Sequence, residues 1–430
     1  MRFGLATREI TPPFPTRMYG YAVRQDTFDA VHDPLTFTAV VLEEGGRRAL
    51  IGAADICTFP NDGSLPGLMD RLAGVAGCPK DNVVLNASHT HGGPMVPSRS
   101  LSYRSGAGGA ERYRDWMYER VTEAAQEAAT NLREGTLWHG EGKTTLPMNR
   151  RPDRNGEVPN APNPGGPVDD RLQVLVLKDG AGEVAAVGIK VACHPVSTGA
   201  QHLITADFVG AWRAAFSEAF GPRVTPVFLQ GAGADARPRH AADGYRWRAL
   251  RHAELAGMGR ELLAETLAVL VRQPLRQVDG LTLEGRIAEV SAPCERQYTT
   301  REQLMPLLKE EGLRERYART CLESLEREGR VPDHVAFQVQ TLWLNRDLAL
   351  IGLNVEPLCG LGARVEAAVA PKRAMLMGYT NGCVAYTPDT VEMKRGGYET
   401  TSYLYNGWSG PLAPGIEDLF AGAVMPSGRS

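Results

Sequence analysis

The stretch NVVLNASHTH at residues 82–91 joins a short apolar run to a polar segment with two histidines. Five further apolar runs end in polar residues or glycines in the same way: 48–57, 184–194, 225–235, 348–356 and 374–386. Their length and composition predict buried strands. Helical patterns separate several of these runs, at 111–132, 207–220 and 246–273. Strands that alternate with helices predict an α/β fold in which mixed β-sheets are layered with helices.

The composition is that of a globular protein, because 43% of the 430 residues are hydrophobic and 23% are charged. The net charge of -3 offers no basic stripe, so a nucleic-acid partner is not expected. The first residues contain no signal-like apolar run, and no segment reaches the roughly 18 apolar residues of a membrane span. We therefore expect a cytoplasmic protein without stable membrane insertion. The seven cysteines form no CxxC pair, which favours reduced thiols and argues against a thiolate zinc site.

Two segments stand apart from the strand and helix patterns. Residues 151–170 are dense in proline, glycine and asparagine, which predicts a long surface loop that is equally suited to be a lid. Residues at about 296–331 have a charged helical pattern. We expect this helical insertion to pack on the periphery, where it would help to shape a substrate entrance.

Polar residues at the ends of the apolar runs mark the expected site. Ligands of open α/β sheets bind beyond the carboxyl ends of strands, where the loops converge. The residues found there are His89, His91, His194, Asp235, Glu356 and Tyr386. We therefore expect the site to form at these strand ends.

The two histidines of His-Thr-His are two residues apart, so in an extended segment both imidazoles would lie on the same side. That geometry allows His89, His91 or both to bind one metal ion. In the alternative interpretation, one histidine caps a turn and the other is a buried, hydrogen-bonded residue. The glycines of SHTHGGP favour close approach of a ligand.

The other strand-end residues are less informative when each is taken alone. His194 precedes a proline, and a single HP dipeptide is more often structural than functional. Glu356 ends an apolar run, where an unpaired carboxylate is costly to bury unless a cation meets it. Tyr386 by itself would be read as packing.

Taken in order along the chain, these segments resemble the amino-terminal catalytic region of the neutral ceramidase family. SHTHGGP (88–94) is similar to the family's SHTHSGP, PMNRRP (147–152) to INRSP, and CHPVST (193–198) to VHPTS. ITADFVG (204–210) is similar to SSDNVG, and LNVEPLCGLGARV (353–365) to PGEFTTMAGRR. The segment 385–405 is similar to YITTPEEYEVQRYEGASTLY. The resemblance implies that residues 1–430 form a single ceramidase-like catalytic domain.

The resemblance also implies a set of roles. Zn²⁺ would be bound by His89, His194, Glu356 and Tyr386, an arrangement that leaves room for water. His91 would transfer protons or orient the substrate, and Arg150 would face the polar head of the substrate. Which of the two paired histidines binds the metal stays open.

Two departures from the family limit what can be carried over. In QGAGADARPR (230–239), Asp235 is retained, but Arg237 stands where the family's GDxSPN has its serine. A serine nucleophile is thus excluded at this position, which leaves attack by zinc-activated water, with Arg150 or Arg237 stabilising the oxyanion. The chain also stops shortly after residue 420, where the family continues into an immunoglobulin-like domain. We therefore expect a small polar or anionic substrate rather than a membrane sphingolipid.

The leading hypothesis is a zinc-dependent amidohydrolase, with ester cleavage chemically close. The catalytic residues expected are His91, Arg150 and Asp235, and the substrate-binding residues expected are Asn149, Asp207, Gln230, Arg237 and Tyr398. Asp207 is equally suited to cap a helix. Asp55 would either hold a ligand histidine or form a turn.

Two other classes stay open. One is a zinc-dependent lyase or isomerase that acts on a sugar acid, with Tyr398 or His91 moving the proton. The other is a non-catalytic metal-binding relative. A small molecule is the expected partner in each enzymatic case, and a homo-oligomer is possible.

Overall fold

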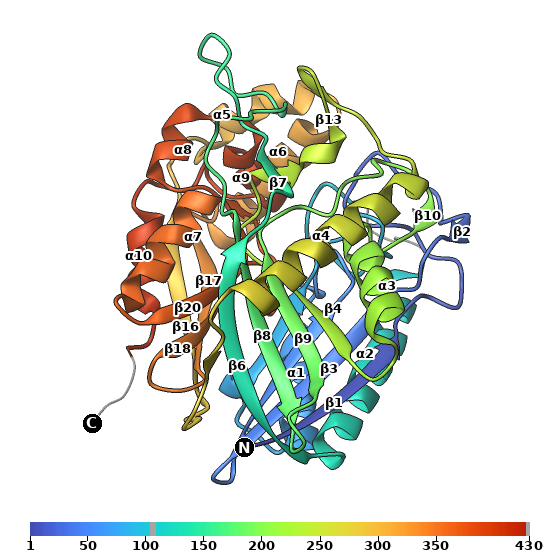
Figure 1. The fold of residues 1–430 in the computed structure, drawn as a ribbon. Helices are drawn as coiled ribbons and strands as arrows, with labels where there is room; N and C mark the ends of the chain where they lie inside the picture. Colours follow the sequence, from blue (N-terminus) through green and yellow to red (C-terminus); the bar gives the residue numbers. More distant parts are fainter. Residues whose placement is uncertain (104–108, 427–430) are drawn as a thin grey trace.

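Two β-sheets lie face to face, and helices cover the outer face of each (Figure 1). The computed structural model describes residues 1–103 and 109–426. The strands of the larger sheet have the order β11 (Thr225–Gln230), β9 (Val184–Val191), β8 (Arg171–Asp179), β6 (Arg133–Lys143), β1 (Arg2–Glu9), β3 (Thr36–Glu44), β4 (Arg47–Ala54) and β5 (Val83–Ala87). A further short strand, β15 (Arg276–Gln277), pairs with β6. The smaller sheet has the order β16 (Glu284–Pro293), β17 (His334–Trp343), β18 (Leu348–Leu353), β20 (Arg373–Met377). The result is a four-layered α/β fold.

The alternation of side chains along the strands explains this layering. In β3, Val41 packs toward the helices, whereas its neighbours Val40 and Leu42 pack toward the smaller sheet. In β18, Leu350 packs toward the larger sheet and Ile351 toward the opposite side. Both sheets are therefore buried on both faces, which is why their strands are apolar almost throughout.

Helices from separate parts of the chain cover the two outer faces. The larger sheet is covered by α1 (Leu65–Ala76), α2 (Ala110–Thr130), α3 (Phe208–Phe220) and α4 (His252–Arg272). The smaller sheet is covered by α5 (Arg301–Leu304), α6 (Leu313–Glu328), α7 (Cys359–Glu366), α9 (Ser402–Asn406) and α10 (Ile416–Ala423), while α8 (Thr390–Arg395) lies nearby in the chain. No helix of the described residues is long and apolar enough to span a membrane.

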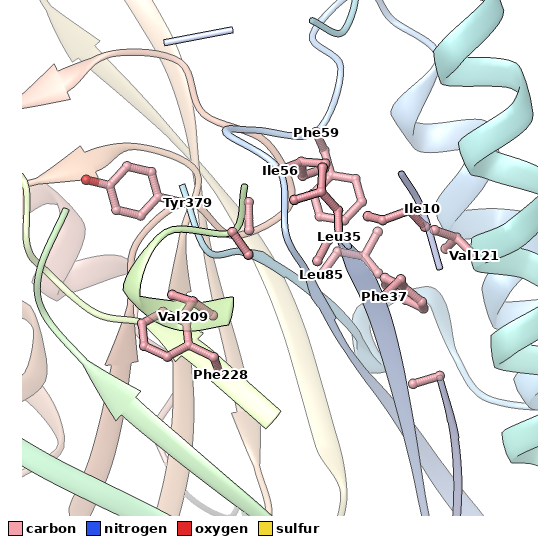
Figure 2. Packing of buried hydrophobic residues seen from close by; sticks show 14 of the residues in the cluster. Ile10, Leu35, Phe37, Ile56, Phe59, Leu85, Val121, Val209, Phe228 and Tyr379 are labelled. Carbon is pink, nitrogen blue, oxygen red and sulfur yellow. The ribbon is translucent and has the colours of Figure 1, made fainter. Parts of the chain in front are cut away.

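The core beneath α1–α4 extends to the carboxyl ends of the strands. Figure 2 shows Leu35, Phe37 and Leu85 packed together, with Tyr379 at the edge of the group and its hydroxyl turned away from the other labelled side chains. All four side chains are completely buried. This apolar packing fixes the strand ends from which the site is built.

Several short pairings connect the strand ends. They are β2 (Ala30–Val31) with β10 (Leu203–Ile204), β7 (Pro147–Asn149) with β12 (Ala236–Pro238), β13 (Ala242–Asp243) with β14 (Arg246–Trp247), and β19 (Glu356–Pro357) with β21 (Tyr386–Thr387). Short 3₁₀ turns also occur: η1 (Lys80–Asn82), η2 (Arg239–Ala241), η3 (Met305–Lys309), η4 (Ala367–Val369) and η5 (Tyr398–Thr400).

The six apolar runs all contain strands, namely β4, β5, β9, β11, β18 and β20, and the three helical patterns correspond to α2, α3 and α4. The strands end before the polar residues do: β5 stops at Ala87, so both histidines of His-Thr-His lie in the following loop. Residues 151–170 run between β7 and β8 without a helix or strand of their own. The segment at 296–331 contains α5, η3 and α6.

Candidate metal centre

Three buried side chains from distant parts of the chain converge at the edge shared by the two sheets. His89 follows β5, His194 follows β9, and Glu356 begins β19. Oε2 of Glu356 lies 3.2 Å from Nε2 of His89 and 3.3 Å from Nε2 of His194. The three ligand atoms lie within 4.8 Å of one another. This spacing is suited to a single metal ion at their centre.

Backbone carbonyls orient the two imidazoles. Nδ1 of His89 lies 2.7 Å from the carbonyl oxygen of Cys57, and Nδ1 of His194 lies 2.7 Å from that of Gly233. Because a carbonyl oxygen only accepts hydrogen bonds, each Nδ1 must carry the proton and donate it. Nε2 of each ring is therefore turned toward Glu356, as in histidines that bind metals.

His89 and Glu356 set the charge balance of this cluster. Burial, followed by the charge of Arg150, lowers the pKa of His194 to about 3, so this ring is neutral. Burial favours the protonated form of Glu356, but the two histidines outweigh it and hold the pKa of Glu356 well below its usual range. Burial also opposes a charge on His89, yet Cys57 and Glu356 raise the pKa of His89 to about 10. In the metal-free protein one proton on His89 thus balances the carboxylate, and a bound metal ion would displace that proton.

His91 also reaches the cluster, although not by the predicted route. His89 has a φ of 65°, so the segment is not extended and the expectation of simple strand alternation is wrong. The two rings still meet, with 3.2 Å between their Nε2 atoms. Nδ1 of His91 has no hydrogen-bond partner among the described residues. Cys57 forms a second group of metal-binding spacing with these histidines.

Tyr386 lies beside Glu356 because β19 and β21 are parallel and these two residues are paired in register. The ring of Tyr386 is nearly parallel to that of His194, with centroids 6.3 Å apart. Arg150 places its guanidinium 5.6 Å from the centroid of Tyr386 and 5.1 Å from that of Tyr398. Tyr386, Arg150 and Tyr398 therefore line one side of the cluster.

A buried charge network holds this side in place. Nε of Arg150 lies 3.3 Å from Oε1 of Glu399, and Nη2 of Arg150 has no hydrogen-bond partner in the described chain. Arg151 pairs with Glu399 and, at 2.8 Å, with Glu392. Sequence reasoning missed both glutamates, since the pairing joins residues about 250 positions apart. Loop 151–170 is thereby fixed to the segment that carries Tyr398.

Four side chains that were expected to bind substrate or to take part in catalysis form hydrogen bonds with the surrounding backbone. Asn149 donates to the carbonyl of Pro167 at 2.8 Å, and Gln230 donates to that of Cys193 at 2.8 Å. Asp207 caps α3 by accepting from Phe208, and Asp235 accepts from the backbone of Cys359 at the start of α7. Burial raises the pKa of Asp207 and of Asp235 to about 6. These side chains position the loops from which the ligands project.

Asp55 has no role in orienting a histidine. Its Oδ2 accepts from the backbone and the hydroxyl of Thr36 and pairs with Arg213 at 2.6 Å. The carbonyls of Cys57 and Gly233 perform the task for which a carboxylate was considered.

Arg237 is half-buried at the wall formed by β12. Its guanidinium lies 4.8 Å from the centroid of Trp247, and its Nη2 donates to the carbonyl of Val196 at 3.3 Å. Nε of Arg237 has no hydrogen-bond partner among the described residues, and burial lowers the pKa of the group. An arginine with an unpaired N–H is suited to bind an anion.

A pocket of about 320 Å³ opens onto the cluster. His89, His91 and Glu356 contribute to its lining, together with six tyrosines: Tyr19, Tyr21, Tyr103, Tyr386, Tyr398 and Tyr405. Four serines also line it: Ser98, Ser100, Ser102 and Ser402. The Ser98 hydroxyl accepts from Tyr19, the Ser100 hydroxyl accepts from the N–H of Ser102, and the Ser402 hydroxyl donates to the Tyr386 carbonyl. None of these three hydrogen bonds involves a histidine, which a serine nucleophile would need as its base.

Two known proteins with similar sequences are neutral ceramidases. The neutral ceramidase of Pseudomonas aeruginosa is 28% identical over 221 residues, which cover 49% of this chain and 32% of the relative. Neutral ceramidase A of Dictyostelium discoideum is 26% identical over 225 residues, which cover 49% of this chain and 30% of the relative. The matched part therefore spans about a third of the length of these relatives. No family model matches the chain.

Solved structures extend the similarity to the whole fold. The crystal structure of the Pseudomonas aeruginosa neutral ceramidase aligns with a TM-score of 0.74 and 21% identity, covering 100% of this chain and 76% of that one. A ceramidase complexed with C2 aligns with a TM-score of 0.72 and 21% identity, covering 95% of this chain and 72% of that one. The chain thus shares the fold of the solved ceramidase structures, and about half of it is similar in sequence to neutral ceramidases.

Proposed function

We propose that the chain is a zinc-dependent hydrolase that cleaves an amide bond, or an ester, of a small polar or anionic molecule with water as the nucleophile. The observation that carries the proposal is the convergence of His89 Nε2, His194 Nε2 and Glu356 Oε2 beside an open pocket, which His89 and Glu356 line. The similarity to neutral ceramidases favours an amide as the scissile bond. Zinc held by these residues and Tyr386 would supply Lewis-acid activation of water and of the substrate carbonyl.

The remaining polar groups have complementary tasks in this proposal. His91 lies beside the cluster, where it would accept the proton of the attacking water and return it to the leaving group. Nη2 of Arg150 is buried without a hydrogen-bond partner in the described chain, which suits it to stabilise negative charge on the carbonyl oxygen. Tyr386 and Tyr398 hold the guanidinium of Arg150 between the cluster and Glu399.

The pocket and Arg237 support the proposed substrate class. A volume of about 320 Å³ is at the lower end for small-molecule sites, and the lining is rich in tyrosine hydroxyls. Arg237 lies within electrostatic range of Tyr21 and Tyr398, both of which line the pocket. We therefore place an anionic group of the substrate toward Arg237.

The test is metal analysis combined with turnover. The wild-type protein is expected to bind about one zinc per chain and to hydrolyse members of a panel of acyl-amides and acyl-esters. His194→Ala should lose both properties, because it removes a ligand. The matched control is His334→Ala, since His334 is exposed, its imidazole pairs with Asp333, and it is not one of the proposed ligands.

The outcomes separate the alternatives. A wild-type protein that fails to bind zinc would contradict the metal assignment. Zinc binding without turnover of any substrate would favour a non-catalytic relative, and an ultraviolet-absorbing unsaturated product would favour a lyase.

A further inference from the structure

Tyr379 is packed directly against the metal cluster. Its ring stacks on that of His89, with centroids 4.1 Å apart and an angle of 27°, and meets the ring of His194 edge-on at 6.0 Å. Its N–H donates to the carbonyl of Val355, the residue before Glu356, and its carbonyl accepts from the N–H of Ala87, the last residue of β5. Tyr379 is thus fixed between the segments that carry two of the ligands.

The hydroxyl of Tyr379 has no hydrogen-bond partner in residues 1–103 and 109–426, although the side chain is completely buried. Other buried tyrosines are satisfied: the hydroxyl of Tyr113 donates to the carbonyl of Ile10, and that of Tyr317 donates to the carbonyl of Trp408, each at 2.8 Å. A buried hydroxyl without a partner is unfavourable and calls for an explanation.

The surroundings of this hydroxyl indicate where its partner would be. Figure 2 shows it turned away from the hydrophobic cluster. The phenol of Tyr379 carries an O–H group, which can donate a hydrogen bond. Nη2 of Arg150 is another buried donor without a hydrogen-bond partner in the described chain. Two hydrogen-bond donors near the metal cluster, the Tyr379 hydroxyl and Nη2 of Arg150, thus have no partner within the described chain.

We propose that Tyr379 is a further catalytic residue, whose hydroxyl donates a hydrogen bond to the oxygen of the substrate's scissile carbonyl group. Together with Nη2 of Arg150, it would form a pair of donors for the negative charge that develops on that oxygen. This inference rests on the proposed function. It differs from a packing role for Tyr379, in which only the ring and its stack on His89 would matter.

Tyr379→Phe separates the two roles because it keeps the stacked ring and removes the hydroxyl. We expect it to bind zinc as the wild type does and to lose about 10- to 100-fold in kcat, with KM nearly unchanged. In the metal-free protein, the variant should melt at the same temperature as the wild type or higher, since no protein hydrogen bond is lost. Tyr379→Leu removes the ring as well and should also weaken zinc binding.

Tyr113→Phe is the matched control. It breaks a hydrogen bond to Ile10 and should lower the melting temperature while zinc binding and kcat stay unchanged. Wild-type kcat in Tyr379→Phe would overturn the proposal, as would a lower melting temperature of the metal-free variant or loss of its zinc. If the wild type itself neither binds zinc nor hydrolyses the panel, the proposed function fails. If the wild type does both and Tyr379→Phe has the same kcat, only the inference about Tyr379 fails.

Discussion

Arg237 lies at the site wall, where the resemblance to neutral ceramidases implies a serine. By that comparison a large cation stands in place of a small hydroxyl. The structure accommodates it by placing the group over Trp247 with one bond to the carbonyl of Val196. Since Nε stays unpaired in the described chain, the charge is available to a ligand.

Replacing Arg237 by alanine should therefore change substrate preference rather than destroy the site. We expect kcat/KM for acyl-amides with a carboxylate to fall about 10- to 100-fold, and that for neutral analogues to change little, because a charge-assisted hydrogen bond is lost. Steady-state kinetics on matched anionic and neutral substrates measures this. Arg239→Ala, at a neighbouring position that pairs with Glu261, is the control. An equal effect on both substrate types would contradict the anion-binding role.

At the scale of elements, the cap of α3 shapes the loop that follows His194. Asp207 accepts from Phe208 at 2.6 Å and from the N–H of Ser197 at 2.7 Å, and it also pairs with the Ser197 hydroxyl. One carboxylate thereby starts α3 and closes the loop from Ser197 to Asp207. Its φ of 60° shows that this closure also holds the backbone in an uncommon conformation.

Asp207→Asn should lower the free energy of unfolding by about 1–3 kcal/mol, because the amide NH₂ would face the N–H of Ser197. The folded state raises the pKa of Asp207 from 3.8 to about 6, so folding favours the protonated carboxyl. The raised pKa of Asp207 therefore adds to the free energy of unfolding below pH 3.8, and this added stability is lost as the pH rises through about 6. In urea denaturation, the free energy of unfolding of the wild type should thus exceed that of Asp207→Asn by more at pH 4 than at pH 7.

The control for this prediction is Thr300→Ala, which removes the exposed cap of α5. It should lower stability by about 1 kcal/mol, without a change of the effect between pH 4 and pH 7. If the free energies of unfolding of wild type and Asp207→Asn instead differ equally at both pH values, that result would show that Asp207 is not the titrating group.

At the scale of the whole molecule, the candidate metal centre joins the two sheets. His89 and His194 follow strands of the larger sheet, whereas Glu356 and Tyr386 belong to segments that adjoin the smaller one. The two sheets also share the apolar layer between them. A metal ion at this junction would bind the folded chain but not the unfolded one, so it should stabilise the entire domain.

Zinc at 100 times its dissociation constant should stabilise the metal-free protein by about 2.7 kcal/mol. For a chain of 430 residues this corresponds to a rise of about 3 °C in Tm, which differential scanning calorimetry can measure. Mg²⁺ should have little effect, because two imidazoles are poor ligands for it. The same shift in His194→Ala would mean that zinc stabilises the protein from another site.

The sequence by itself determined the buried strands, the three long helices and most of the residues at the candidate metal centre. Apolar runs and helical periodicity are local patterns, and they record burial directly. His89, His194, Glu356 and Tyr386 could be named because each stands where such a run ends and within a segment of family likeness. The strands β1, β3, β6, β8, β16 and β17 were missed. In β16, for example, exposed and buried residues alternate, so the strand forms no continuous apolar run.

Only the tertiary structure decided which atoms meet. The carbonyls that orient His89 and His194 come from residues 32 and 39 positions away, and no local pattern marks a backbone carbonyl as a partner. The same holds for Tyr379, whose unpaired hydroxyl is evident only once its surroundings are fixed. Local sequence specifies how each segment folds, whereas hydrogen-bond partners and charge balance depend on segments that packing brings together.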